Sequence, residues 1–126
     1  MHLKKWRWAL ALCMACILAL SLAPPSADLP TTGWDKSNHM LGFAVLAVLA
    51  HWALPGRTAL ALLGLVAFGG LIEILQSLTP YRQADFADLI ADGAGLLVGE
   101  GLARLLTWWR PHWRATVQVP AQRRRG

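Results

Sequence analysis

The sequence predicts an all-α fold, an integral membrane bundle of four transmembrane helices. Apolar residues make up 56% of the 126 residues, whereas charged residues make up only 15%. Soluble domains contain about 25% charged residues, and an apolar run of about 20 residues is long enough to cross the hydrocarbon core as a helix. Four such runs follow one another along the chain, and the length suffices for one domain.

The first two apolar runs both end at proline. Residues 6–23 form the first run, and the following Pro24 and Pro25 cannot continue a helix. This run also fits a signal peptide, because a basic start precedes an apolar middle and small residues. We favour a retained helix, since proline directly follows the apparent cleavage point. Residues 37–54 form the second run, which ends at Pro55.

The last two runs have the same organisation. Residues 58–78 form the third run, which ends just before Pro80, and residues 86–109 form the fourth, which we expect Pro111 to end. At a rise of about 1.5 Å per residue, each of the four runs can cross about 30 Å of hydrocarbon.

Basic residues indicate how the four helices are oriented. If the N-terminus is cytoplasmic, ten of the 12 Lys and Arg residues fall on the cytoplasmic side, and only Lys36 and Arg82 fall outside. Interfacial tryptophans gather on the same cytoplasmic side: Trp6, Trp8, Trp52, Trp108, Trp109 and Trp113. We therefore expect a multi-pass protein of the bacterial inner membrane with both termini in the cytoplasm.

The net charge of +5 has the same explanation. Because the basic residues follow membrane topology, we expect membrane lipids as partners and no nucleic acid. Residues 1–115 are expected to form the membrane domain, and the basic residues 116–126 a disordered cytoplasmic tail.

Several polar residues have structural interpretations. We expect Cys13 and Cys16, inside the first run, to be small packing residues. Glu100 has Arg104 as its partner four residues later, and His51 is expected at the cytoplasmic interface.

The remaining polar residues fall at the outer ends of the last three predicted helices. Within each group, the spacing of three or four residues places side chains on one helix face. A charge inside the bilayer costs about 3 kcal/mol, so these side chains must face one another or water. We therefore predict an outward-facing polar pocket formed by nine residues: Asp35, Lys36, His39, Glu73, Gln76, Arg82, Asp85, Asp88 and Asp92.

The order of these motifs resembles the signature of VanZ-like membrane proteins. That family typically shows Asp-Lys-x-x-His followed by Phe, then Glu-x-x-Gln, then Arg-x-x-Asp-x-x-Asp, and a Gly-x-x-x-Gly ending. This chain has "DKSNH" and Phe43, then "EILQ", "RQADFAD", Gly95 and Gly99, all within residues 35–99. The resemblance implies a role in the cell envelope and in tolerance of glycopeptides such as teicoplanin, which act at its outer face.

One position departs from the family pattern. The family usually has Asn where this chain has Asp92. An amide can donate and accept hydrogen bonds, whereas an ionised carboxylate only accepts. We expect Asp92 either to be protonated or to face Arg82 or Lys36.

An enzyme is the first function that the predicted pocket allows. His39, Glu73, Asp85 and Asp88 would supply acid and base groups with separated pKa values. The two basic residues of the outer half would hold a phosphate or carboxylate of a lipid-linked envelope precursor.

Two other functions use the same residues without turnover. The pocket could bind a cationic or sugar-bearing glycopeptide, or it could relay protons in transport. Because four helices are few for a transporter, transport would require a homodimer. A divalent metal could bind His39, Glu73, Asp85 and Asp88, but a single His without Cys argues against zinc. We expect no metal and no cofactor; the structural alternative is that these residues only hold the helices together.

Overall fold

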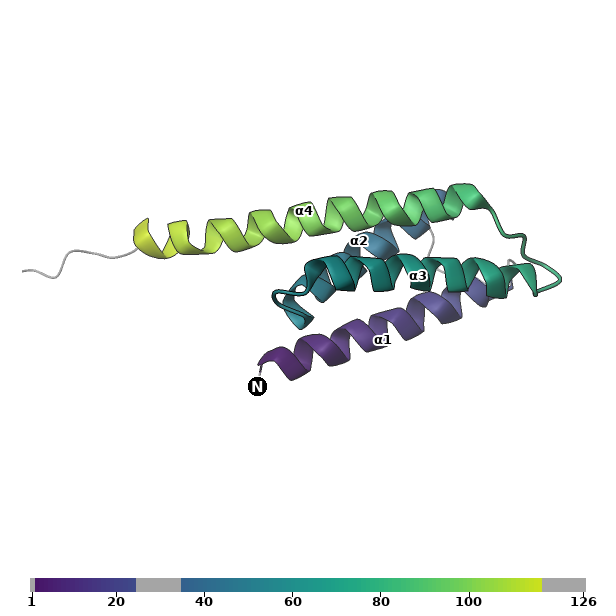
Figure 1. The fold of residues 1–126 in the computed structure, drawn as a ribbon, viewed down its shortest axis with the longest axis horizontal. Helices are drawn as coiled ribbons and strands as arrows, with labels where there is room; N and C mark the ends of the chain where they lie inside the picture. Colours follow the sequence, from purple (N-terminus) through teal and green to yellow (C-terminus); the bar gives the residue numbers. More distant parts are fainter. Residues whose placement is uncertain (1, 25–34, 117–126) are drawn as a thin grey trace, which may run out of the picture.

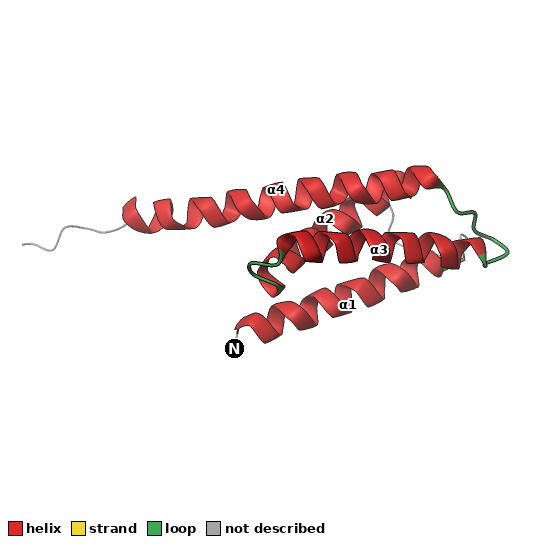
Figure 2. Ribbon diagram, viewed as in Figure 1, coloured by secondary structure: helices red, strands yellow, loops and turns green. Residues whose placement is uncertain are grey.

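The computed structural model describes residues 2–24 and 35–116, with side chains through residue 109. The described residues form four helices and no strand, which confirms the all-α prediction (Figure 1). Figure 2 shows that short loops join the last three helices. The helices are α1 (His2–Leu22), α2 (Asp35–Ala53), α3 (Thr58–Ser77) and α4 (Phe86–Thr116).

The end of α4 differs from the prediction. The helix passes through Pro111 and continues to Thr116, so the expectation that Pro111 ends it is wrong. Proline removes one N–H donor, but the hydrogen bonds of the neighbouring residues can carry a helix past it. The expected disordered tail falls almost wholly on residues 117–126, which lie outside the described part of the chain.

A tight turn joins α2 to α3. Gly56 has φ of 76°, a left-handed conformation that glycine adopts without steric cost. The Arg57 N–H then donates to the Leu54 carbonyl at 3.0 Å, which closes the turn. The turn places α2 and α3 antiparallel, as Figure 1 shows.

Helices α2 and α4 run parallel and in close contact. Their paired residues keep a nearly constant sequence separation: 49 and 52 residues for the two contacts of Lys36, 53 for His39 with Asp92, and 49 for His51 with Glu100. Between these pairs, a Cβ on Gly95 or Gly99 would collide with backbone atoms of Met40 or Ala44. The two glycines therefore let the backbones approach closely, as a small-xxx-small pair does.

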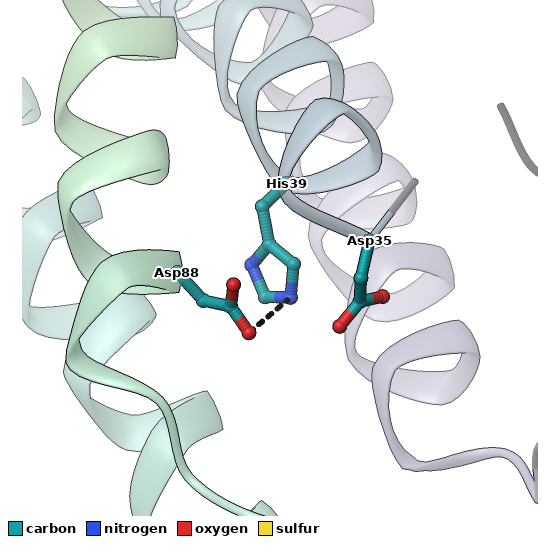
Figure 3. Close-up of side chains that lie close together, drawn as sticks. All are labelled: Asp35, His39 and Asp88. Atoms are coloured by element: carbon teal, nitrogen blue, oxygen red, sulfur yellow. Dashed lines mark ion pairs between the residues drawn. The ribbon is translucent and has the colours of Figure 1, made fainter. Parts of the chain in front are cut away.

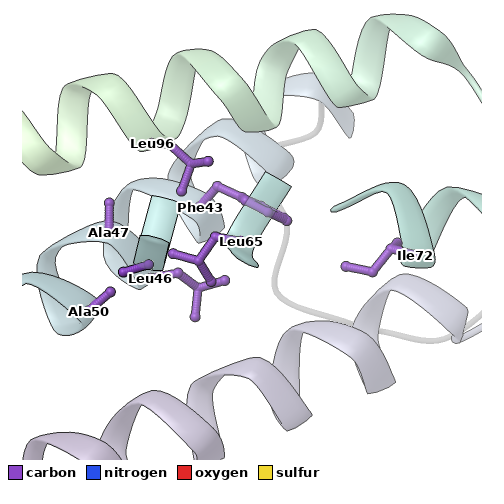
Figure 4. Close-up of a cluster of buried hydrophobic side chains, with 8 residues drawn as sticks. Phe43, Leu46, Ala47, Ala50, Leu65, Ile72 and Leu96 are labelled. Carbon is purple, nitrogen blue, oxygen red and sulfur yellow. The ribbon is translucent and has the colours of Figure 1, made fainter. Parts of the chain in front are cut away.

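The buried core residues come from α2, α3 and α4, and α1 packs against them. Phe43, Leu46, Ile72 and Leu96 are almost completely buried (Figure 4). Helix α1 contributes only partly buried residues, among them Cys13. The packing prediction holds for Cys13 but is wrong for Cys16, whose side chain is exposed because it lies on the outer face of α1.

Two helices, α1 and α3, are long and apolar enough to cross a membrane by length and composition. Core helices of soluble proteins and signal sequences can meet the same criterion. Large apolar side chains are also exposed on the surface, including Leu63 of α3 at 68% and Leu97 of α4 at 73%. The criterion thus supports two of the four predicted spans, α1 and α3, and the spans over α2 and α4 stay predictions.

Candidate functional site

Three helix ends meet at a cluster of polar side chains, which we call the polar site. His39 of α2 lies between two carboxylates of α4: its Nδ1 is 2.9 Å from Asp92 Oδ1 and its Nε2 is 3.9 Å from Asp88 Oδ2. All three side chains are buried. An ionised Asp92 carboxylate would accept a hydrogen bond from His39 Nδ1, and His39 Nε2 is directed toward Asp88.

Lys36 pairs with both acidic residues at the start of α4. Its Nζ lies 2.8 Å from Asp85 Oδ2 and 3.4 Å from Asp88 Oδ1. Asp85 also caps α4, because its Oδ1 accepts the Ala87 N–H at 2.9 Å. The hydrogen bond from Lys36, followed by that from the Ala87 N–H, lowers the pKa of the Asp85 carboxyl from its usual value.

Glu73 connects α3 to this arrangement. Its Oε2 accepts the backbone N–H of Asp85 at 2.8 Å. Gln76, one turn later, is buried but points toward α1, where its Nε2 donates to the Ser21 carbonyl at 3.0 Å. The polar site thus includes Glu73, while the Gln76 amide nitrogen is directed to α1.

Three buried oxygens lack a hydrogen-bond donor within the described part of the chain: Glu73 Oε1, Gln76 Oε1 and Asp92 Oδ2. A buried acceptor without a donor costs free energy, so each of the three requires an explanation. Space beside Asp92 is tight, since a Cβ at Gly69 would lie 2.7 Å from its Oδ2.

Arg82 and Asp35 lie at the rim of the polar site. Arg82 Nη2 donates to the Ala23 carbonyl at 3.1 Å, and its Nη1 lies 3.9 Å from Asp35 Oδ1. The expectation that Asp92 faces Arg82 or Lys36 is wrong, because its partner is His39. The parallel register of α2 and α4 pairs Lys36 with the first turn of α4 and places Asp92 one turn deeper.

The described structure therefore gathers eight of the nine predicted residues at one end of the bundle, and directs the amide nitrogen of Gln76 toward α1. Both basic side chains, Lys36 and Arg82, have carboxylate partners in the cluster, and the buried side-chain atoms that lack a partner among the described residues are all acceptors. A hollow lined by these residues stays a prediction.

The carboxylates also offer a possible set of metal ligands. Ligand atoms of Asp35, His39 and Asp88 lie within 4.8 Å of one another, and Figure 3 shows the imidazole between the two carboxylates. This set differs from the predicted one, because Glu73 and Asp85 are not part of it. The Lys36 ammonium, 3.4 Å from Asp88, already supplies positive charge at this position.

A second polar cluster lies toward the other end of α2 and α4, and we call it the inner cluster. The predicted pair is confirmed, with Arg104 Nε 2.7 Å from Glu100 Oε1. His51 lies 3.1 Å from Glu100 Oε2, a contact that was not predicted, while its expected place at the cytoplasmic interface stays a prediction. His51 and Glu100 lie 49 residues apart, the same separation as Lys36 and Asp85, so the register of one pair indicates the other.

A family model described as VanZ/LLP1 matches residues 7–107. The chain belongs to the VanZ/LLP1 family. The match confirms the resemblance to VanZ-like proteins and extends it over α1, since it begins at Arg7 and ends within α4 at Thr107. All nine predicted site residues of this VanZ/LLP1 family member lie inside the match, and membership together with two apolar helices indicates a membrane protein. No curated protein and no solved structure matches the chain.

Proposed function

We propose that this VanZ/LLP1 protein crosses the cytoplasmic membrane four times, with both termini in the cytoplasm and the polar site at the extracytoplasmic surface. The distribution of basic residues supports this orientation. The rings of Trp6 and Trp52 are in contact at the end of the bundle away from the polar site, with centroids 4.8 Å apart and planes tilted by 41°, as expected of an interfacial aromatic pair.

The proposed topology is tested by thiol labelling with a membrane-impermeant reagent. Gln83→Cys and Lys4→Cys are made in a background carrying Cys13→Ala and Cys16→Ala. We expect position 83 to react in intact cells and position 4 to react only after permeabilisation. Reaction of both positions in intact cells would overturn the topology.

We further propose that the polar site acts on a cell-envelope component, the headgroup of a lipid or lipid-linked precursor, and so contributes to glycopeptide tolerance. The carrying observation is His39, buried and oriented by Asp92 at 2.9 Å with its Nε2 toward Asp88. A carboxylate that orients one imidazole nitrogen leaves the other suited to exchange a proton with a substrate. Glu73 Oε1 adds an acceptor for a hydroxyl or ammonium group.

Expression of wild type and Glu73→Ala at matched membrane levels tests this function. The expected result is that Glu73→Ala loses teicoplanin tolerance and that mass spectrometry finds a difference in the envelope lipids. Glu100→Ala is the matched control, because Glu100 is a buried carboxylate of the inner cluster. If Glu73→Ala changes only protein abundance, the residue has a structural role and the proposal fails.

Binding without turnover is the second candidate. Its support is that Lys36 and Arg82 are paired inside the cluster, whereas Glu73, Gln76 and Asp92 each keep an acceptor oxygen that no donor of the described residues reaches. Such a site favours a ligand rich in donors, such as a sugar or the ammonium group of a glycopeptide. A binder would raise tolerance in proportion to its copy number and leave the lipids unchanged.

Proton-coupled transport is a variant of the second candidate. Among the described residues, two histidines of α2 each lie against a carboxylate of α4, His39 against Asp92 and His51 against Glu100. Transport would require loss of activity on replacement of either histidine, whereas a site confined to the outer surface requires only His39.

A further inference from the structure

We propose that a groove between α1, α2 and α3, at the end away from the polar site, binds one acyl chain of an anionic phospholipid of the cytoplasmic leaflet. The phosphate of that lipid would lie at Arg7 and Arg57. This inference rests on the membrane orientation proposed above, and it concerns a surface that the polar site does not use.

The groove is apolar and comes from three helices. Its volume is about 240 Å³, and its walls include Leu10 and Met14 of α1, Leu54 of α2, and Ala61 and Gly64 of α3. Ala61 and Gly64 share one face of α3, and a Cβ at Gly64 would meet nothing within 4 Å. Because none of the described residues that line the groove has a polar side chain, the occupant must be apolar along its length.

Two basic residues adjoin one end of this groove. Arg7 lies one turn before Leu10 on the same face of α1, and its Nε donates to the Ala53 carbonyl at 3.3 Å. The backbone of Arg57 is bonded to two groove residues, because its N–H donates to Leu54 at 3.0 Å and its carbonyl accepts from Ala61 at 2.9 Å. Both basic residues therefore lie next to residues that line the groove.

The side chains of Arg7 and Arg57 differ from the basic side chains of the polar site in their ion-pair partners. Among the described side chains, neither has a carboxylate within ion-pair distance, whereas Lys36, Arg82 and Arg104 each have at least one. An apolar groove that ends at two basic residues complements an anionic phospholipid, with its acyl chain in the groove and its phosphate at the guanidinium groups.

A lipid fits this surface better than a second copy of the chain. The groove has a volume of only about 240 Å³. That volume is too small to take up a helix of a second copy, which is about 10 Å across with its side chains. The aromatic pair Trp6 and Trp52 marks the interfacial level at the same end, where the phosphates of the cytoplasmic leaflet would lie.

Native mass spectrometry of the full chain, extracted from nanodiscs of phosphatidylcholine and phosphatidylglycerol, tests the proposal. Wild type is expected to retain one phosphatidylglycerol. Gly64→Leu fills the groove and should retain neither lipid. Arg57→Gln should keep an acyl chain but lose about fivefold in preference for phosphatidylglycerol, the contribution of one basic residue near an anionic surface.

Gly101→Leu is the matched control, because a Cβ at Gly101 also meets nothing within 4 Å and the residue lies on α4, outside the groove. It should retain lipid as wild type does. Lipid retention by Gly64→Leu equal to that of Gly101→Leu overturns the proposal, and so does an unchanged preference in Arg57→Gln. A wild-type dimer that Gly64→Leu converts to monomer would instead assign the groove to a second copy.

Failure of this inference is distinguishable from failure of the proposed function. Thiol labelling at positions 4 and 83 tests the orientation without reference to lipid binding. If labelling agrees with the orientation while lipid retention does not respond to Gly64→Leu, only the groove proposal fails. Gly64→Leu should also keep the glycopeptide tolerance of wild type, because its side chain lies away from the polar site.

Discussion

The polar site and the inner cluster use similar chemistry on the same two helices but differ in how completely their hydrogen bonds are satisfied. Each contains a histidine of α2 against a carboxylate of α4. In the inner cluster, Arg104 and His51 together contact both oxygens of Glu100. In the polar site, Asp92 Oδ2 and Glu73 Oε1 lack a donor within the described structure.

This difference indicates that the inner cluster stabilises the fold, whereas the polar site is the candidate functional site. Buried polar groups that only stabilise a fold are normally hydrogen-bonded, as Glu100 is. The polar site accepts a free-energy cost at its unpaired oxygens, which is common where a fold positions groups for binding or catalysis. The inner cluster should therefore matter for stability and the polar site for activity.

The largest effect is expected from a substitution that separates α2 from α4 and so disrupts both clusters. Gly99→Leu places a side chain where the backbone of Ala44 lies, so α2 and α4 must separate. We expect the free energy of unfolding to fall by about 1–3 kcal/mol or more, measured by circular dichroism of the protein in detergent. Gly101→Leu, on the open face of α4, should change it by less than about 0.5 kcal/mol. Equal stability of the two variants would contradict the close parallel packing.

Replacement of each histidine sharpens the comparison. His39→Ala should abolish glycopeptide tolerance at matched abundance, because it removes the group that faces Asp88 and Asp92. His51→Ala should leave tolerance intact and lower the free energy of unfolding by about 1 kcal/mol, the contribution of one hydrogen bond. Loss of tolerance in both variants would favour proton-coupled transport over an outer site.

A smaller effect is expected from the residue that departs from the family pattern. Asp92→Asn keeps an oxygen that can accept from His39 Nδ1, so the free energy of unfolding should change by about 1 kcal/mol or less. Tolerance should fall, since a neutral amide stabilises a protonated imidazole less than a carboxylate does. Glu100→Gln, the corresponding change in the inner cluster, should leave tolerance unchanged. Wild-type tolerance in Asp92→Asn would show that the charge of Asp92 is dispensable.

The smallest expected effect concerns the exposed edge of the polar site and depends on pH. The pKa of Asp85 is lowered by Lys36, so its stabilisation is complete above the unfolded pKa of about 3.9 and is lost as the pH falls through the lower folded value. Asp85→Asn should remove this part of the acid-induced decrease in thermal midpoint while its amide oxygen still caps α4. An unchanged acid profile would show that the Lys36–Asp85 pair does not contribute to stability.

Much of the architecture follows from local features of the sequence. Apolar runs that stop at Pro24, Pro55 and Pro80 predict the C-terminal ends of three of the four helices to within a few residues. Pro111 misleads, because one missing N–H does not decide where a helix ends when the neighbouring bonds persist. The cost of burying charge likewise predicts that His39 and Glu73 gather at one end of the bundle.

The pairing inside the polar site does not follow from the same features. Spacing along α4 places Asp85, Asp88 and Asp92 on one face, but it does not say which of them meets Lys36 and which meets His39. The contact between His51 and Glu100 is equally invisible in local spacing, because the two residues lie 49 positions apart.

The sequence by itself determined the helices, the family and the end at which polar side chains gather, because apolar length, proline and the cost of a buried charge act locally along the chain. Only the tertiary structure decided that Asp92 holds His39, that His51 meets Glu100 and that Gln76 turns toward α1. Those contacts depend on the register of two parallel helices, which is set where Gly95 and Gly99 meet the backbone of α2.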